Sequence, residues 1–142
     1  MAFQADSLIP ARFLILLANL IILILALWTR DGNVVSSLPY EFDEEEYYFK
    51  DRELIVGLSL GIAFIGVEFI GFFSGVSMFK PSIGLLSIFL HGLSCVLTSQ
   101  WLIHSWQASS YWLIFGAFSI LPAAVESINM ICILTGAIIK EL

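Results

Sequence analysis

The chain has 142 residues, of which 59% are apolar and 13% are charged, and its formal net charge is −6. Soluble domains carry about 25% charged residues, whereas the mean hydropathy here is +0.95. This composition indicates an integral membrane protein and excludes an ordinary cytosolic enzyme. Because four apolar helices of roughly 20 residues would use almost the whole chain, we predict an all-α, four-transmembrane-helix antiparallel bundle forming a single domain over residues 1–142.

The first predicted span covers residues 10–28. Pro10 suits the first position of a helix, and the Arg12 side chain is placed where it can reach the lipid headgroups. Asn19 is the only strongly polar residue inside this span, and it can hydrogen-bond to another helix. The end of the span lacks the small-residue pattern of signal-peptide cleavage, so we expect it to stay in the membrane.

The only sizeable predicted loop, residues 29–52, holds most of the acidic residues of the chain. Asp43 and Glu46 have the spacing of a helix capping box, which predicts a helix that begins near Glu44. Such an acidic segment repels nucleic acid, and it either keeps one end of the protein in water or attracts a basic partner. Under the second interpretation, the partner contacts are Glu44, Glu45 and Glu46.

The second predicted span covers residues 54–73 and carries a carboxylate in its apolar run. Glycines with a four-residue spacing precede Glu68, which falls seven residues after the second of them and on the same helix face. Small residues on one face allow two helices to approach closely. The glycines that we expect in helix packing are Gly57, Gly61, Gly71 and Gly75.

The third predicted span covers residues 82–103, and its polar residues follow spacings of four, three and four. They form one helical stripe on an otherwise apolar segment, which should point into the bundle. The members of this stripe are Ser87, His91, Ser94 and Thr98.

The fourth predicted span covers residues 111–139, and its polar residues also recur every three or four positions. Pro122 precedes Glu126 by four residues, so it frees a backbone carbonyl and can kink the helix. We therefore count Pro122 among the helix-packing residues and expect a polar notch beside the acid.

Three ionisable side chains fall at similar depths in three of the spans. At ~1.5 Å per residue, Glu68, His91 and Glu126 lie roughly 8, 12 and 20 Å from the end that holds the termini. A charged side chain at the centre of a membrane helix costs about 2.5 kcal/mol or more, so these groups should face one another. We predict a buried polar cluster of these three residues, with Asn129 and Asn19 nearby.

The predicted cluster has three interpretations. In the first, the side chains pair and hold the helices in one register. In the second, they form a proton or cation path, and the protein is a small transporter or proton channel. In the third, one histidine and two carboxylates bind a metal. The sequence contains neither a histidine-rich metal box nor a nucleophile–base pair, so we expect a non-enzymatic protein without catalytic residues, metal or cofactor.

Cations are equally divided between the two ends of the predicted bundle, so they do not decide its orientation. All four tryptophans lie at the end that holds the long loop, as in an aromatic belt at a membrane interface. This distribution predicts four crossings with both termini on one side.

Segments along the whole chain carry a resemblance to one protein family. They are Leu8–Leu14, Trp28–Asn33, Leu38 and Pro39, Glu45–Tyr47, Glu68–Phe79, His91, Tyr111–Phe115 and Leu121–Glu126. Together they resemble the transmembrane protein 107 family of the ciliary transition zone. One departure is the C-terminus, where the family is associated with a more basic tail and this chain has only Lys140.

The resemblance implies a four-span scaffold with both termini in the cytosol and a non-cytosolic acidic loop. It also implies residence at the base of the cilium, in the Meckel-syndrome module, beside tectonic, meckelin and B9-domain proteins. There the protein would help to build the gate that controls which membrane proteins enter the cilium, and thereby support ciliogenesis.

Overall fold

The computed structural model of the chain is all-helical and describes residues 2–142, with side chains from Ser7 onwards. Four helical segments are each long and apolar enough to cross a membrane, which confirms the predicted fold class. The first three are α1 (Ala2–Thr29), α3 (Glu44–Phe73) and α4 (Pro81–Ile103). The fourth consists of α5 (Ala108–Phe115), the π-helical turn η1 (Gly116–Ile120) and α6 (Leu121–Glu141).

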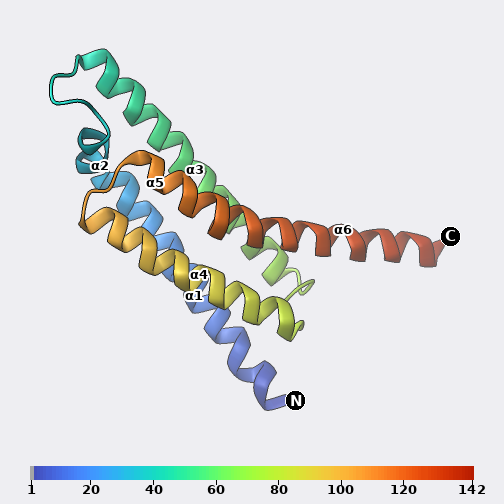
Figure 1. The fold of residues 1–142 in the computed structure, drawn as a ribbon. Coiled ribbons are helices and arrows are strands. Elements are labelled where there is room, and N and C mark those ends of the chain that lie inside the picture. Colours follow the sequence, from blue (N-terminus) through green and yellow to red (C-terminus); the bar gives the residue numbers. More distant parts are fainter. Residues whose placement is uncertain (1) are drawn as a thin grey trace.

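The long helices run in alternating directions (Figure 1). α1 packs mainly against α4 and also against α3, while α3 packs against α6. The second half of α6 leaves the other helices and extends away from them (Figure 1). The short helix α2 (Asp31–Ser36) closes the opposite end of the bundle, so both termini lie away from it.

Helical structure occupies much of the segment predicted as a loop. α3 begins at Glu44, and Asp43 and Glu46 form the predicted capping box. The Asp43 backbone N–H donates to the Glu46 carboxylate at 3.4 Å. Three glutamates lie in the first turn, where they also complement the positive end of the helix dipole.

Pro10 sits differently from the sequence expectation, whereas Pro122 lies at an interruption of the fourth span. Pro10 lies inside α1 and not at its start. A proline removes one helical hydrogen bond, but neighbouring helices allow this in apolar spans. Pro122 lies in the first turn of α6, directly after η1. The fourth span is thus interrupted by a π-helical turn. This turn contains the residue four positions before Pro122, whose backbone carbonyl a proline ring would meet in a regular α-helix.

Aromatic side chains fill the bundle near α2. Tyr111 and Trp101 are almost fully buried, with ring centroids 5.4 Å apart. Gly57 and Gly61 let this layer approach α3. A Cβ atom at Gly57 would lie 3.0 Å from a Tyr111 ring carbon, and one at Gly61 would lie 2.9 Å from the Tyr111 hydroxyl. These two glycines therefore lie where α5 packs on α3.

Tyr111→Phe is expected to lower the free energy of unfolding by about 1 kcal/mol, the net value of a typical hydrogen bond. The Tyr111 hydroxyl donates to the Gly57 carbonyl at 2.8 Å inside the bundle, whereas the ring packing is unchanged by the substitution. Unfolding in detergent micelles, followed by tryptophan fluorescence, measures the effect. Tyr40→Phe is the control, because Tyr40 is fully exposed. Equal stability of both variants would contradict the prediction.

The α2 end is tied to α3 and to the α4–α5 connection by polar contacts. The Arg30 guanidinium binds Asp51 with nitrogen–oxygen distances of 2.6 and 3.0 Å. The hydrogen bond and charge of Asp51 raise the pKa of Arg30 above its ordinary value, so the Arg30 guanidinium stays charged. Buried Asn33 donates to the carbonyls of Trp101 and Trp106, both at 2.9 Å. These contacts fix the connection that precedes α5.

Candidate functional site

The first part of the buried polar network is a chain of three side chains from α1, α4 and α3. The Asn19 amide nitrogen lies 2.8 Å from His91 Nδ1, and His91 Nε2 lies 2.8 and 2.9 Å from the two Glu68 carboxylate oxygens. All three side chains are buried. Ser94 Oγ donates to Asn19 Oδ1 at 3.4 Å, which orients the amide group.

This arrangement defines the tautomer of His91. An amide nitrogen can only donate, so Nδ1 of His91 accepts and carries no proton. Nε2 then carries the ring proton and donates it to Glu68. The contact between His91 and Glu68 is therefore a hydrogen bond from the imidazole Nε2–H to the Glu68 side chain, and Asn19 sets its direction.

The second part of the network is an ion pair between α1 and α6. Arg12 Nη2 lies 3.0 Å from Glu126 Oε2, and the two side chains are only 2% and 1% exposed. Arg12 Nη1 also donates to Ser77 Oγ at 2.9 Å, and the guanidinium lies 5.4 Å from the centre of the Phe72 ring. One arginine thereby joins α1, the end of α3, the α3–α4 turn and α6.

This ion pair corrects two expectations. Arg12 does not reach towards headgroups, because α1 begins before Pro10 and the guanidinium points into the bundle. Glu126 binds Arg12 rather than His91. A guanidinium offers several donors and a full charge, so it compensates a buried carboxylate better than a neutral imidazole does. The pairing of Arg12 was not predicted from the sequence, although a cation inside an apolar span, in a chain with acids in other spans, is a signal for it.

The structure thus brings Glu68, His91 and Glu126 inside the bundle as members of two pairs, not as one triad. Glu68 and Glu126 nevertheless line the same small cavity, together with Arg12 and Ser87. Pro122 lines it too, so this cavity corresponds to the polar notch expected beside the acid.

Asn129 lies apart from the Asn19–His91–Glu68 chain. Its side-chain oxygen accepts from Lys80 Nζ at 2.5 Å, and its side-chain nitrogen donates to the Val76 carbonyl at 3.5 Å. It therefore ties α6 to the α3–α4 turn. We predicted that Asn129 lies near His91. Instead, Asn129 lies one turn beyond Glu126 on α6 and contacts the α3–α4 turn.

The two glycines at the end of α3 differ in role. A Cβ atom at Gly71 would lie 2.1 Å from Glu126 Oε1, so only glycine lets this carboxylate reach α3. Gly75 lies after α3 with φ of +79°, and a Cβ atom there would meet none of the described residues within 4 Å. Gly75 therefore serves the left-handed turn and not helix packing, which corrects the predicted Gly71–Gly75 seam.

Two observations bear on what the site can do chemically. Among the described residues, no three His, Cys, Asp or Glu side chains are grouped so as to hold a metal ion. The cavity between Glu68 and Glu126 has about 10 Å³ of space for the centre of a water-sized probe. The arrangement pairs charges between helices, and it provides no space for a larger solute at this position.

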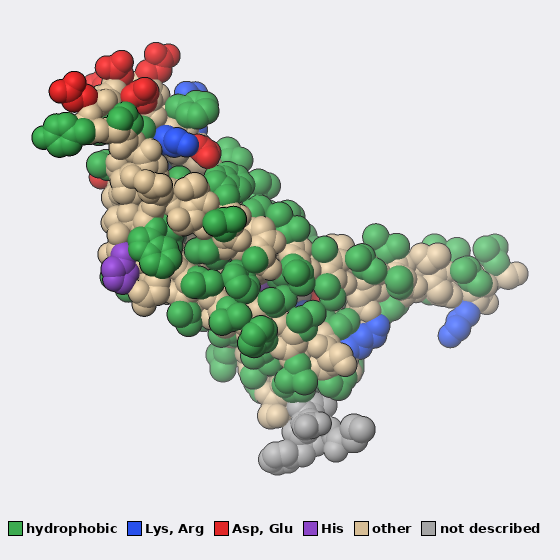
Figure 2. All heavy atoms as spheres, in the orientation of Figure 1, with side chains coloured by type: hydrophobic (Ala, Val, Ile, Leu, Met, Phe, Trp, Pro, Cys, Tyr) green, Lys and Arg blue, Asp and Glu red, His purple; other side chains and the backbone are tan. Residues whose placement is uncertain are grey.

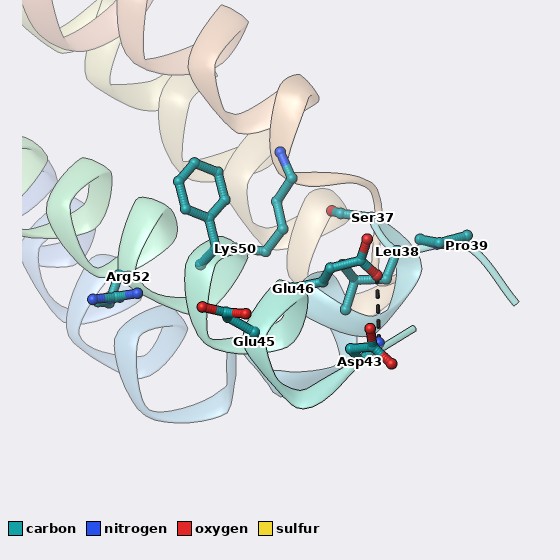
Figure 3. A pocket seen from close by; sticks show the side chains of 9 residues that line it. Ser37, Leu38, Pro39, Asp43, Glu45, Glu46, Lys50 and Arg52 are labelled. Carbon is teal, nitrogen blue, oxygen red and sulfur yellow. Dashed lines mark hydrogen bonds between the residues drawn. The ribbon is translucent and has the colours of Figure 1, made fainter. Parts of the chain in front are cut away.

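A wider groove lies at the other end of the molecule, on the first turns of α3. It has a volume of about 680 Å³ and is open to its surroundings (Figure 3). Its lining combines acidic, basic and apolar side chains: Ser37, Leu38, Pro39, Asp43, Glu45, Glu46, Phe49, Lys50 and Arg52. Lys50 also pairs with Glu53 at 2.9 Å, so part of the basic charge is already bound.

The fold and its internal ion pairs define a multi-pass membrane protein with four candidate spans. Comparison with known sequences then narrows the class. A family model described as TMEM107, transmembrane protein, matches residues 8–130. The chain belongs to the transmembrane protein 107 family.

Three relatives illustrate the similarity, and all three carry the name transmembrane protein 107. The zebrafish (Danio rerio) protein is 47% identical over 120 residues, covering 84% of this chain and 89% of the relative. The Homo sapiens protein is 41% identical over 123 residues, covering 87% and 88%. The Xenopus laevis protein is 41% identical over 128 residues, covering 90% and 91%. No solved structure matches the chain.

Proposed function

We propose that this protein is a non-enzymatic membrane scaffold of the ciliary transition zone. In this role it helps to assemble the gate that controls ciliary membrane composition and supports ciliogenesis. Membership of the transmembrane protein 107 family over residues 8–130 carries the proposal. The bundle is consistent with a scaffold, because its buried charges are paired with one another and its outer surface is left for lipid and protein contacts.

The proposed topology places both termini and the α3–α4 turn in the cytosol and the acidic segment outside it. Figure 2 shows the acidic side chains gathered at one end of the molecule, while hydrophobic side chains cover most of the remaining visible surface. Under this proposal, the acidic end meets the non-cytosolic parts of tectonic- and meckelin-type partners. The cytosolic end is then the side that B9-domain proteins can reach.

The proposed partner contacts are the exposed Glu44, Glu45 and Glu46 at the start of α3. Two of these side chains also line the wide groove, next to exposed Arg52 (Figure 3). A basic segment of a partner would be attracted by the excess of acids at this end, and its apolar residues could contact Phe49 in the groove. Charge of this kind contributes mainly to partner choice and to the rate of association.

Tagged protein purified from ciliated cells tests the function. We expect it to localise to the base of the cilium and to co-purify with tectonic, meckelin and B9-domain proteins. Cells that lack the protein should assemble fewer cilia, and expression of this chain should restore them. Normal cilia and normal ciliary membrane composition in such cells would overturn the proposal.

Neutralising the acidic contact should weaken partner recovery. We expect Glu44→Gln, Glu45→Gln and Glu46→Gln together to reduce partner pull-down several-fold, with a stronger effect at low than at high ionic strength. The variant keeps the side-chain size and leaves Asp43 to cap α3. Glu141→Gln, at the far end of α6, is the control and should not change recovery. Unchanged recovery for the triple variant would show that partners do not bind through these three side chains and would point to the membrane-spanning parts of the helices.

The alternative function, a small transporter or proton channel, needs a water-filled path to the buried acids. The space beside Glu126 corresponds to about one water molecule. This geometry favours charge pairing over transport. Reconstitution in liposomes should therefore give no proton flux above that of protein-free vesicles.

A further inference from the structure

We propose that the cavity between α1, α3, α4 and α6 binds one water molecule, which joins the two buried pairs into a single network. The cavity is lined by four polar side chains, Arg12, Glu68, Ser87 and Glu126, and by four apolar ones. Its space of about 10 Å³ for a probe centre is close to the minimum for one water and excludes a larger ligand.

Three buried polar atoms belong to residues that line the cavity and need a hydrogen-bond partner. Arg12 Nε, Ser87 Oγ and Glu126 Oε1 are buried and have no hydrogen-bond partner among the residues that the structure describes. Their side chains are 2%, 3% and 1% exposed. Buried polar groups are almost always hydrogen-bonded, since leaving one unpaired is costly. A buried water needs two to four polar partners, which these residues can supply.

The chemistry of the unpaired atoms selects water over an ion. Arg12 Nε–H is a donor and needs an acceptor, whereas Glu126 Oε1 needs a donor. A metal cation would leave Arg12 Nε unsatisfied and would be repelled by the guanidinium. An anion would be repelled by Glu126 and Glu68. Only a small molecule that both donates and accepts satisfies both atoms, and Ser87 Oγ can take either role.

The inferred water gives Glu68 a second connection. Both of its oxygens lie near His91 Nε2, and the carboxylate also lines the cavity. The water therefore extends the Asn19–His91–Glu68 chain to Arg12 and Glu126. All four long helical segments then share one hydrogen-bonded network, which goes beyond the pairing of individual helices.

Proton-detected solid-state NMR on the full chain in lipid bilayers tests the site. The protein is perdeuterated, carries ¹⁵N-arginine and is protonated at exchangeable positions. Only three arginines occur, and Arg12→Lys assigns the signal of the buried one. We expect magnetisation transfer from water to Arg12 Nε, together with slow hydrogen exchange. Absence of transfer to this nitrogen, with transfer intact to exposed Arg52, overturns the proposal.

A matched pair of variants locates the water. Ser87→Val places a methyl group in the cavity, so we expect loss of the transfer from water to Arg12 Nε. Thr98→Val is the control. Thr98 is also buried on α4, and its hydroxyl has no partner within the described part of the chain, but it does not line the cavity. Transfer should persist in this control. Undiminished transfer in folded Ser87→Val overturns the assigned position. If that variant does not fold, the unsubstituted protein decides the proposal.

Discussion

Replacing Arg12 by methionine is expected to lower the free energy of unfolding by about 3–5 kcal/mol. The substitution removes the cation that lies 3.0 Å from Glu126, and it leaves that carboxylate buried and uncompensated. Methionine retains an unbranched apolar side chain, so most packing against Phe72 survives. Thermal and denaturant unfolding of the purified protein in micelles measures the loss.

Two further variants separate the charge from the packing. Arg52→Met removes a cation from an exposed position and should change stability by less than about 0.5 kcal/mol. Adding Glu126→Leu to Arg12→Met should recover most of the lost stability, because replacing both members of a buried pair by apolar groups is often neutral. If Arg12→Met matched the unsubstituted protein, the ion pair would not hold α1 to α6.

The second large effect is expected at Gly71. Gly71→Ala should destabilise the protein by about 1–3 kcal/mol through overpacking, because the added Cβ atom would lie 2.1 Å from Glu126 Oε1. The carboxylate must then move, which disturbs its pairing with Arg12. Unfolding in micelles again measures the change.

Gly66→Ala is the matched control on the same helix, since a Cβ atom there would meet no atom of the residues described by the structure within 4 Å. We expect this control to be neutral or to stabilise α3 by about 0.5–1 kcal/mol, because alanine loses less conformational freedom than glycine. A Gly71→Ala protein as stable as Gly66→Ala would show that α6 can shift away from α3 without loss. It would also weaken the assignment of Gly71 to the α3–α6 contact.

Both predictions concern the same junction, where α1, the end of α3 and α6 meet around one guanidinium. Arg12 also reaches the α3–α4 turn through Ser77, and Lys80 of that turn binds Asn129 on α6. The junction thus holds the first half of α6, whereas the second half extends beyond the other helices (Figure 1). A lost contact here should loosen α6 before it affects the aromatic layer around Tyr111.

The sequence by itself determined the features that depend on local composition and spacing. Four apolar runs, the inward polar stripe of α4 and the capping box at Asp43 follow from hydropathy, helical periodicity and cap chemistry. These properties involve residues within a few turns of one another, so no knowledge of the other helices is required. The position of polar residues within apolar runs also predicted that Glu68, His91 and Glu126 are buried.

Only the tertiary structure decided which of these residues meet. The ion pair of Arg12 and Glu126 joins positions 114 residues apart, and Asn129 binds Lys80 instead of lying near His91. Such contacts depend on the rotation and axial shift of each helix, which are set by packing across the whole bundle. The number of residues from the end of a span predicts how deep a side chain lies in the membrane. It does not predict which side chain it contacts, because that also depends on how each helix is rotated about its axis.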